Sequence, residues 1–241
     1  MKRQDKPRFS PSRSASLQYE RSLRKIAVNI GKLIERIGDP EKILKDPSNI
    51  ERILHDYANE LTPWAVNIAE NIIKNAEQIN KKQWFAYADE IGIGLREELK
   101  NTDTSNAFDQ ILKEQVHYIT SLPIDAAERI QRLAKESLIR GERYDQIKDD
   151  IMKSGLVTET RARLIARTEM NKASFALTKA RAEQIGSPGY IWRSHKDKRT
   201  RPSHKSMNGK FVKWDDPPTL DNLTGHAGAL PNCRCFTLVQ F

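Results

Sequence analysis

Two stretches near the C-terminus, GYIWRSHKDKRTRPSHKSMNGKFVKW at residues 189–214 and PNCRCFTLVQF at residues 231–241, decide how the last part of the chain folds. Residues 190–194, 210–214 and 235–241 are short runs rich in aromatic and β-branched side chains, which is typical of β-strands. Asn208-Gly209, directly before the second run, is a frequent hairpin turn. The sequence therefore predicts a small antiparallel sheet.

So few short strands are marginally stable alone and need another element to pack against. The preceding segment supplies one. Residues 160–185 have the apolar spacing of a long helix, with Thr158 as the predicted cap and Gly186-Ser187-Pro188-Gly189 as the end. We expect the sheet to lie on this helix.

The sequence predicts a helical body over residues 16–156. Apolar side chains recur at helical spacing from Leu23 to Ile37, and later segments continue the pattern. Pro63 and Pro123 are each predicted to lie in the first turn of a new helix. Residues 1–15 mix Pro and Ser with basic residues and are predicted to be a disordered basic arm. The expected fold class is mainly α, with a helical N-terminal body followed by a small α+β C-terminal module that contains a short antiparallel sheet.

The formal net charge of +9 is concentrated in two places. Residues 1–25 hold eight basic and two acidic residues, and residues 191–214 hold eight basic residues and one acidic residue. Such clusters favour phosphate backbones or acidic protein surfaces, whereas the alternative is a solvated tail and hairpin without a polyanionic partner. The residues predicted to contact nucleic acid are Arg193, Lys196, Lys198, Arg199, Arg201 and Lys205.

The chain contains no run of about 18 apolar residues, and its N-terminus is charged where a signal peptide needs an apolar segment. We therefore expect a protein without a membrane partner that is made for the cytoplasm. In that reducing compartment two cysteines one residue apart do not indicate a disulfide scaffold.

The cysteines suggest either a metal site or two buried thiols. Cysteines at positions i and i+2 of an extended segment project from the same face. The predicted ligand set for zinc is Cys233, Cys235, His204 and His226, with His195 or Asp197 as substitutes. In the alternative, both cysteines are small core residues and the histidines belong to solvated loops.

A catalytic interpretation uses some of the same residues. His204, His226, Asp197 and Glu169 beside a basic patch contain what a metal-dependent nuclease needs, namely a metal, a base and cationic stabilisation. Glu169 is alternatively predicted to pair with an arginine of the basic hairpin, and Trp192 with Trp214 to fill a small core rather than stack on bases.

Taken in order, Ala166-Arg-Thr-Glu169, Trp192, Asp197-Lys-Arg-Thr-Arg-Pro-Ser-His204, Gly209 and Pro231-Asn-Cys-Arg-Cys235 form a series that resembles the C-terminal domain of the phage Mu F-like head-morphogenesis family. The resemblance covers residues 157–241, and residues 16–156 are similar only in position and length. The family's motif residues fall here on Arg167, Glu169, Trp192, Asp197, Arg201, His204, Gly209, Cys233 and Cys235.

The resemblance implies a minor head protein without enzymatic activity, located in the virion head at the portal vertex and assembled in the host cytoplasm. Its implied role is in procapsid assembly or in DNA packaging and delivery, and its implied partners are the portal protein, the major capsid or scaffolding protein, and double-stranded DNA. Residues 16–156 are then the segment that contacts the portal or capsid. The alternative is a metal-dependent nuclease or another nucleic-acid-processing factor.

Overall fold

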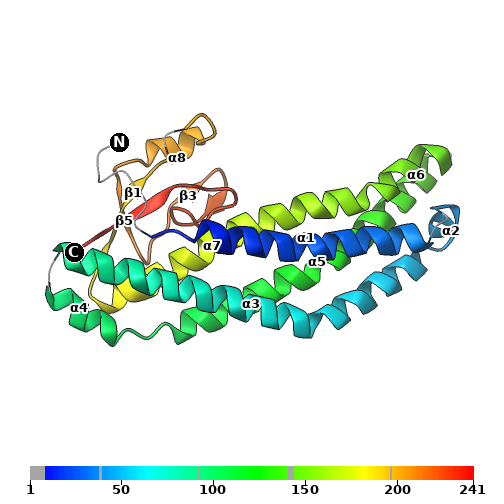
Figure 1. The fold of residues 1–241 in the computed structure, drawn as a ribbon. Helices are drawn as coiled ribbons and strands as arrows, with labels where there is room; N and C mark the ends of the chain where they lie inside the picture. The colour runs from blue at the N-terminus through cyan, green and yellow to red at the C-terminus, as the bar shows by residue number, and fades with distance from the viewer. Residues whose placement is uncertain (1–8, 38–39, 92, 141–143, 196) are drawn as a thin grey trace. The chain divides into compact units, whose positions relative to one another are not determined.

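The computed structural model describes residues 9–37, 40–91, 93–140, 144–195 and 197–241. Within these residues the fold class is the expected one: a mainly α chain with a small antiparallel sheet near its C-terminus (Figure 1). The helices are α1 (Arg13–Ile37), α2 (Pro40–Lys45), α3 (Pro47–Ile91), α4 (Ile93–Lys100), α5 (Ser105–Arg140), α6 (Tyr144–Met152), α7 (Ser154–Gln184) and α8 (Pro202–Ser206). The strands are β1 (Gly189–Arg193), β2 (Phe211–Lys213), β3 (Thr219–Leu220), β4 (Leu223–Thr224) and β5 (Phe236–Gln240).

Two prolines and one threonine that were predicted to begin helices lie inside them. Pro63 is within α3 and Pro123 is within α5. A proline in a helix removes one backbone hydrogen bond, and near both prolines side-chain hydroxyls bond to carbonyls of the preceding turn: Thr62 Oγ1 to Ala58 O at 3.4 Å, and Thr120 Oγ1 to Val116 O at 3.0 Å. The long helices therefore tolerate prolines that a local pattern reads as starts.

Thr158 likewise lies inside α7, where its hydroxyl donates to Ser154 O at 2.8 Å. The helix begins one turn earlier than the predicted cap because Ser154 and Gly155 continue the helical backbone.

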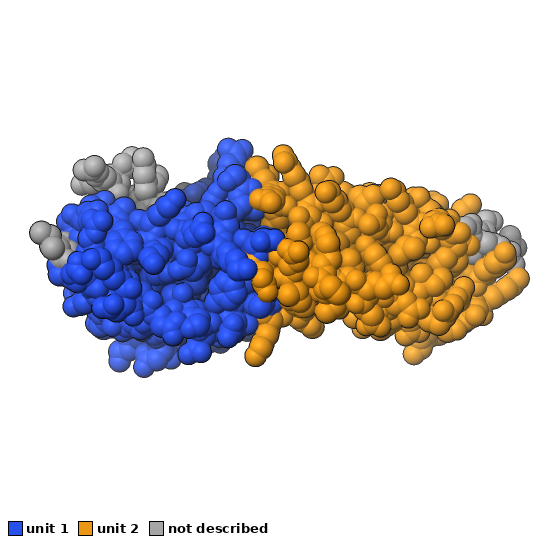
Figure 2. Space-filling view, turned by 60° about the horizontal axis from the view of Figure 1, so that its bottom comes forward, with its two compact units in different colours: residues 1–16, 71–112, 167–241 blue, residues 17–70, 113–166 orange. Residues whose placement is uncertain are grey.

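The described residues group into two compact units, each built from separate stretches of the chain (Figure 2). One unit, here called the helical unit, comprises residues 17–70 and 113–166. The other, here called the C-terminal unit, comprises residues 1–16, 71–112 and 167–241. The helices α1, α3, α5 and α7 thus contribute residues to both.

The helical unit consists of helices packed along buried apolar faces. On α1 the side chains of Leu23, Ile30 and Ile34 are buried, as their spacing predicted. Polar contacts also join the helices: Tyr19 Oη donates to Gln115 Oε1 at 2.6 Å, and Arg24 Nη2 lies 2.7 Å from Glu159 Oε1.

The C-terminal unit contains the three-stranded sheet, in the order β2-β1-β5, with β1 antiparallel to both neighbours. In this register Tyr190 lies opposite Val212 on β2 and Val239 on β5. The shorter strands β3 and β4 form a separate antiparallel pair.

The sheet packs on α7, as expected. Phe175 of α7 lies with its ring 6.4 Å from Tyr190 and 6.1 Å from Trp214, and Lys179 Nζ donates to Trp214 O at 2.7 Å. The same core includes Trp84 of α3, which is fully buried. The strands thus gain the apolar partner that they lack alone.

The expected disordered arm spanned residues 1–15. In the structure Phe9 is buried with its ring 4.5 Å from that of Trp84, and α1 begins at Arg13, while residues 1–8 lie outside the described part. Disorder was predicted from the composition of the segment, and a single apolar residue such as Phe9 changes that composition little. Among the described residues, none of the helices has both the length and the apolar character needed to cross a membrane.

Candidate functional site: a cysteine-histidine cluster beside an arginine-lined cavity

Three short elements bring His204, Cys233 and Cys235 together. His204 lies on α8, which begins with Pro202 and comes after β1 in the chain. Cys233 and Cys235 lie directly before β5, after a turn in which Cys233 N donates to Leu230 O at 2.9 Å. All three side chains are buried, with relative exposures of 3%, 4% and 6%.

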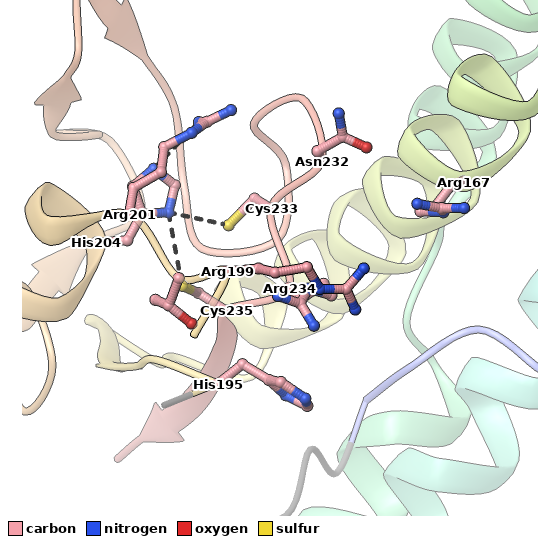
Figure 3. Close-up of a pocket in the computed structure, with 10 residues that line it drawn as sticks. Arg167, His195, Arg199, Arg201, His204, Asn232, Cys233, Arg234 and Cys235 are labelled. Atoms are coloured by element: carbon pink, nitrogen blue, oxygen red, sulfur yellow. Dashed lines mark hydrogen bonds between the residues drawn. The ribbon is translucent and has the colours of Figure 1, made fainter. Parts of the chain in front are cut away.

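One nitrogen of His204 faces both sulfurs. His204 Nδ1 lies 3.4 Å from Cys233 Sγ and 3.6 Å from Cys235 Sγ, as the dashed lines in Figure 3 show. These three ligand atoms lie within 4.8 Å of one another. Two thiols and an imidazole are ligand types that zinc takes in proteins, so three of the four predicted ligands converge.

The thiols differ in their readiness to ionise. Hydrogen bonds from the Cys235 thiol and from Gly228 N, which lies 3.4 Å from Cys233 Sγ, lower the pKa of Cys233 to about 5 against the cost of burial. The hydrogen bond to Cys233 and burial raise the pKa of Cys235. Cys233 is therefore the thiol that ionises first.

Gly228 has a backbone that suits its role beside Cys233. Its φ of +86° is in the region that favours glycine, and a side chain there would also meet Cys235 O at 3.0 Å.

The fourth predicted ligand, His226, lies elsewhere in the core, which corrects the expected set. Its ring stacks on Phe175 at 4.8 Å, and its Nδ1 lies 3.1 Å from Tyr190 Oη, which also accepts a hydrogen bond from Ala227 N at 3.1 Å. Burial, with a smaller effect of the Lys179 charge, lowers the pKa of His226 to about 4. The neutral ring of His226 is therefore part of the core, where the hydroxyl of Tyr190 fixes its position.

A cavity of about 330 Å³ adjoins the cluster and is lined by all three of its residues. Its other walls are strongly basic. The arginines that line it are Arg167, Arg199, Arg201 and Arg234. Figure 3 shows the side chains of Arg199, Arg201 and Arg234 around the cysteines.

Asp197 fixes one wall of this cavity. Its carboxylate accepts from Arg234 Nη2 at 2.7 Å, from Arg199 N at 3.0 Å and from Thr200 Oγ1 at 3.0 Å, and Arg234 Nη1 contacts the second oxygen. The hydrogen bonds from Arg234 are the largest cause that lowers the pKa of Asp197. A bidentate carboxylate-guanidinium pair of this kind holds an arginine in a defined orientation. Sequence reasoning missed Arg234, although its place between the two cysteines is a signal.

The residues predicted to contact nucleic acid divide in two. Lys198, Arg199 and Lys205 are exposed, whereas Arg193 and Arg201 are half-buried. Arg201 Nη2 donates to Pro231 O at 3.0 Å, and Lys196 lies outside the described residues.

The remaining motif residues have mostly structural surroundings. Trp192 and Trp214 are both buried in the core, which is the position expected for them. The ring of Trp192 meets that of His204 edge-on at 5.6 Å. Gly209, with φ of +89°, forms the predicted turn, and its N donates to Trp192 O at 2.8 Å. Glu169 is buried, and its Oε1 lies 2.9 Å from Lys172 Nζ. Its pairing with an arginine of the basic hairpin stays a prediction.

Thr168 and Asn171, neighbours of Glu169 on α7, were not singled out from the sequence. Thr168 Oγ1 accepts from Asn232 N at 3.4 Å, and Asn171 Nδ2 donates to Cys233 O at 3.5 Å. The helix therefore supports the loop that carries the cysteines.

The family comparison matches this same region. The model described as phage Mu protein F like protein matches residues 128–238, which include α8, the cysteine-histidine cluster and the first three residues of β5. Residues 128–238 are thus similar to the phage Mu F-like family. The resemblance expected from the ordered motifs is thereby confirmed.

Two relatives extend the Mu F-like match. An uncharacterized protein of Haemophilus influenzae is 28% identical over 187 residues, which are 76% of this chain and 41% of that protein. The minor head protein GP7 of Bacillus phage SPP1 is 28% identical over 125 residues, which are 46% of this chain and 40% of that protein. The chain thus spans about two fifths of the length of the curated relatives that it matches. No solved structure matches the chain.

Proposed function

We propose that this Mu F-like chain is a bacteriophage minor head protein, carried in the virion head at the portal vertex, that acts in procapsid assembly or in DNA packaging and delivery. The observation that carries the proposal is the family match over residues 128–238, supported by the similarity to the minor head protein of Bacillus phage SPP1. The proposed partners are the portal protein and the major capsid or scaffolding protein.

Two exposed aliphatic side chains of the helical unit support a contact with such a partner. Ile139 and Leu156 are 76% and 66% exposed, which is high for aliphatic side chains of this size. Burying them against another subunit stabilises an assembly through the same apolar transfer that stabilises a core. We therefore assign the contact with the portal or capsid to this unit.

The assembly role is tested by co-sedimentation of the full chain with portal protein or procapsids of the same phage. The variants Ile139→Ser and Leu156→Ser are expected to weaken the association at least tenfold while the circular dichroism spectrum stays unchanged. Phe211→Ser, an exposed position on β2 of the C-terminal unit, is the matched control and keeps the association. Absence of any association of the wild-type chain with portal, capsid or scaffolding protein contradicts the proposal.

DNA contact is the finer part of the proposal and is assigned to the exposed basic residues of the C-terminal unit. Replacing Lys198, Arg199 and Lys205 by Gln is expected to weaken binding to duplex DNA and to reduce the slope of its logarithmic salt dependence by about 2 to 3, because about one counterion is released for each phosphate contact. Lys25→Gln with Lys32→Gln, exposed positions of the helical unit, is the control. Salt-independent binding, or equal weakening by both sets, contradicts DNA contact at this surface.

A second candidate, a metal-dependent nuclease, is favoured by one observation. His204 and the two cysteines line the same cavity as four arginines, so a metal-binding set and cationic groups suited to a phosphodiester lie together. Plasmid cleavage by the purified chain, abolished both by His204→Ala and by Cys233→Ser, supports this candidate against the non-enzymatic one. No cleavage with added zinc, magnesium or manganese removes it.

A further inference from the structure

The distances in the cysteine-histidine cluster match those around a tetrahedral zinc ion. With zinc-sulfur bonds of about 2.3 Å and zinc-nitrogen bonds of about 2.0–2.1 Å, a tetrahedral site places sulfur and nitrogen about 3.6 Å apart. His204 Nδ1 lies 3.4 Å from Cys233 Sγ and 3.6 Å from Cys235 Sγ. We propose that His204, Cys233 and Cys235 bind one zinc ion whose fourth coordination position opens into the arginine-lined cavity and accepts an oxyanion.

Hydrogen bonds hold these three groups only in pairs, because the Cys235 thiol bonds to Cys233 and His204 Nδ1 has a single site to offer. A neutral imidazole nitrogen that accepts has one lone pair, so His204 Nδ1 is able to take a proton from only one of the two thiols. A nitrogen that carries a proton has one N–H to share between them. A metal ion between the three atoms engages both sulfurs and the nitrogen at once.

The surroundings supply the outer hydrogen bonds that thiolate ligands need. Gly228 N donates to Cys233 Sγ at 3.4 Å. The buried indole Nε1 of Trp192 lies beside Cys235 and has no hydrogen-bond partner among the described residues. An N–H buried without a partner costs free energy, which a nearby thiolate offsets.

The contact between Arg201 and His204 is compatible with zinc on Nδ1. A metal on Nδ1 requires the proton of the ring to be on Nε2. Arg201 Nη1 lies 3.5 Å from Nε2, at the outer limit of a hydrogen bond, whereas its Nη2 donates to Pro231 O at the shorter distance of 3.0 Å. Arg201 therefore lines the cavity without competing for the ring.

Among the described residues three ligand side chains converge, and His226 lies against Phe175 instead, so the fourth coordination position is assigned as open. All three ligands line a cavity of about 330 Å³, which is large enough for a phosphate group. Two thiolates and zinc sum to no net charge, so an oxyanion on the ion needs other cations nearby. Arg199 and Arg167, which have no carboxylate ion pair among the described residues, provide them.

The ligand class is therefore a phosphate oxyanion, either free inorganic phosphate or the phosphodiester of a nucleic acid strand. Guanidinium groups bind this class through planar pairs of N–H donors. The proposal does not depend on the role in head assembly, because it concerns metal content and anion binding of the isolated chain.

The first test is the metal content of the full chain, purified from zinc-supplemented cells and dialysed, by elemental analysis. We expect about one zinc per chain in the wild type and a loss of at least fivefold in Cys233→Ser, Cys235→Ser and His204→Ala. His117→Gln, an exposed histidine of the helical unit, is the control and retains the zinc. Wild-type protein without zinc, or equal zinc in the cysteine variants, overturns the proposal.

The second test uses cobalt in place of zinc, and does not need a folded variant. Two thiolate ligands predict a sulfur-to-cobalt charge-transfer band in the near ultraviolet together with visible bands of a tetrahedral ion. Absence of the charge-transfer band overturns the assigned ligands.

The open position is tested by titrating the cobalt protein with inorganic phosphate and, separately, with a short single-stranded oligonucleotide. We expect the visible bands to shift, with at least fivefold weaker binding in Arg199→Ala. A shift with phosphate alone identifies a free anion as the ligand, and a shift with both identifies the nucleic acid backbone as a further source. Bands that respond to neither, or that change in His195→Gln without any anion, overturn the open position.

Discussion

The helical unit and the C-terminal unit are ordered by different means. In the helical unit, long helices bury repeated aliphatic side chains such as Ile30 and Ile34, and many residues share the stabilising free energy. In the C-terminal unit, strands of two to five residues are held by aromatic rings and by hydrogen bonds to single buried groups, such as Tyr190 and Ser187. The helical unit is therefore expected to tolerate substitutions that keep the volume of a buried side chain, whereas the C-terminal unit depends on individual hydrogen-bonding atoms.

Two tryptophans of α3 give the largest expected contrast. Trp84 is fully buried in the C-terminal unit, and Trp64 is 37% exposed in the helical unit. Trp84→Ala is expected to lower the free energy of unfolding by about 3–5 kcal/mol, because it removes ring contacts with Phe9 and Tyr87 and leaves a cavity. Trp64→Ala is expected to change it by less than about 1 kcal/mol. Urea unfolding followed by circular dichroism measures both, and equal losses would break the comparison.

The pH dependence of stability provides a second contrast. The pKa of His226 in the folded chain is about 4, below its ordinary value of 6.5, so the unfolded chain binds a proton more readily. The contribution of His226 to the free energy of unfolding is therefore constant above about pH 7 and falls by about 3 kcal/mol as the pH drops from 6.5 to 4. Urea unfolding at several pH values measures the fall.

His55 of the helical unit is the control for this effect. His226→Gln is expected to flatten the profile between pH 6.5 and 4, and His55→Gln is expected to leave it unchanged. A profile that is the same in His226→Gln and the wild type would assign the pH dependence to other groups.

Removal of one oxygen atom gives a smaller contrast. Tyr190→Phe leaves Ala227 N and His226 Nδ1 buried without the hydroxyl that bonds to them, and is expected to cost about 1–3 kcal/mol. Tyr57→Phe in the helical unit removes only a 3.3 Å contact with Asn29 at the surface and is expected to cost almost nothing. Equal unfolding midpoints for the two variants would show that the hydroxyl of Tyr190 is dispensable.

The smallest expected effect concerns Asp197, whose ion pair with Arg234 is accessible to solvent. Asp197→Asn is expected to lower the melting temperature slightly at pH 7. Because the pKa of this carboxyl is below its ordinary value of 3.8, its stabilising contribution is present above that value and disappears as the pH falls further. The difference between variant and wild type should therefore shrink in acid, and a constant difference would exclude the ion pair as its cause. Asp216→Asn, an exposed residue after β2, is the control.

The sequence predicted most of the fold because the dominant signals are periodic. The helical spacing on α1, the turn at Gly209 before β2 and the strands β1, β2 and β5 all follow local rules, whereas α8 lies between β1 and that turn, so the turn is not a tight hairpin. The helix starts predicted at Pro63 and Pro123 were wrong. Proline favours the first turn of a helix, but a long helix also tolerates it in the interior when packing continues on both sides.

The candidate site was predictable only in part. Cys233, Cys235 and His204 are chemically distinctive, and their types indicated a shared site before their positions were known. His226 was included for the same reason, yet its place is fixed by the ring of Phe175 and the hydroxyl of Tyr190, which are distant in sequence. The role of Arg234 also depends on a tertiary contact, its pairing with Asp197. The two residues are far apart in the sequence, so no local sequence pattern indicates this pairing.

The division of the chain into interleaved segments limits how genes for such proteins exchange parts. Residues 71–112 and 167–241 share one core, in which Trp84 and Tyr190 belong to the same cluster. A recombination event between them would combine the strands of one ancestor with the supporting helix of another. Viable chimeras should therefore be rare unless the two ancestors agree at the aromatic positions, and descent by whole-gene replacement is favoured over the shuffling of contiguous domains.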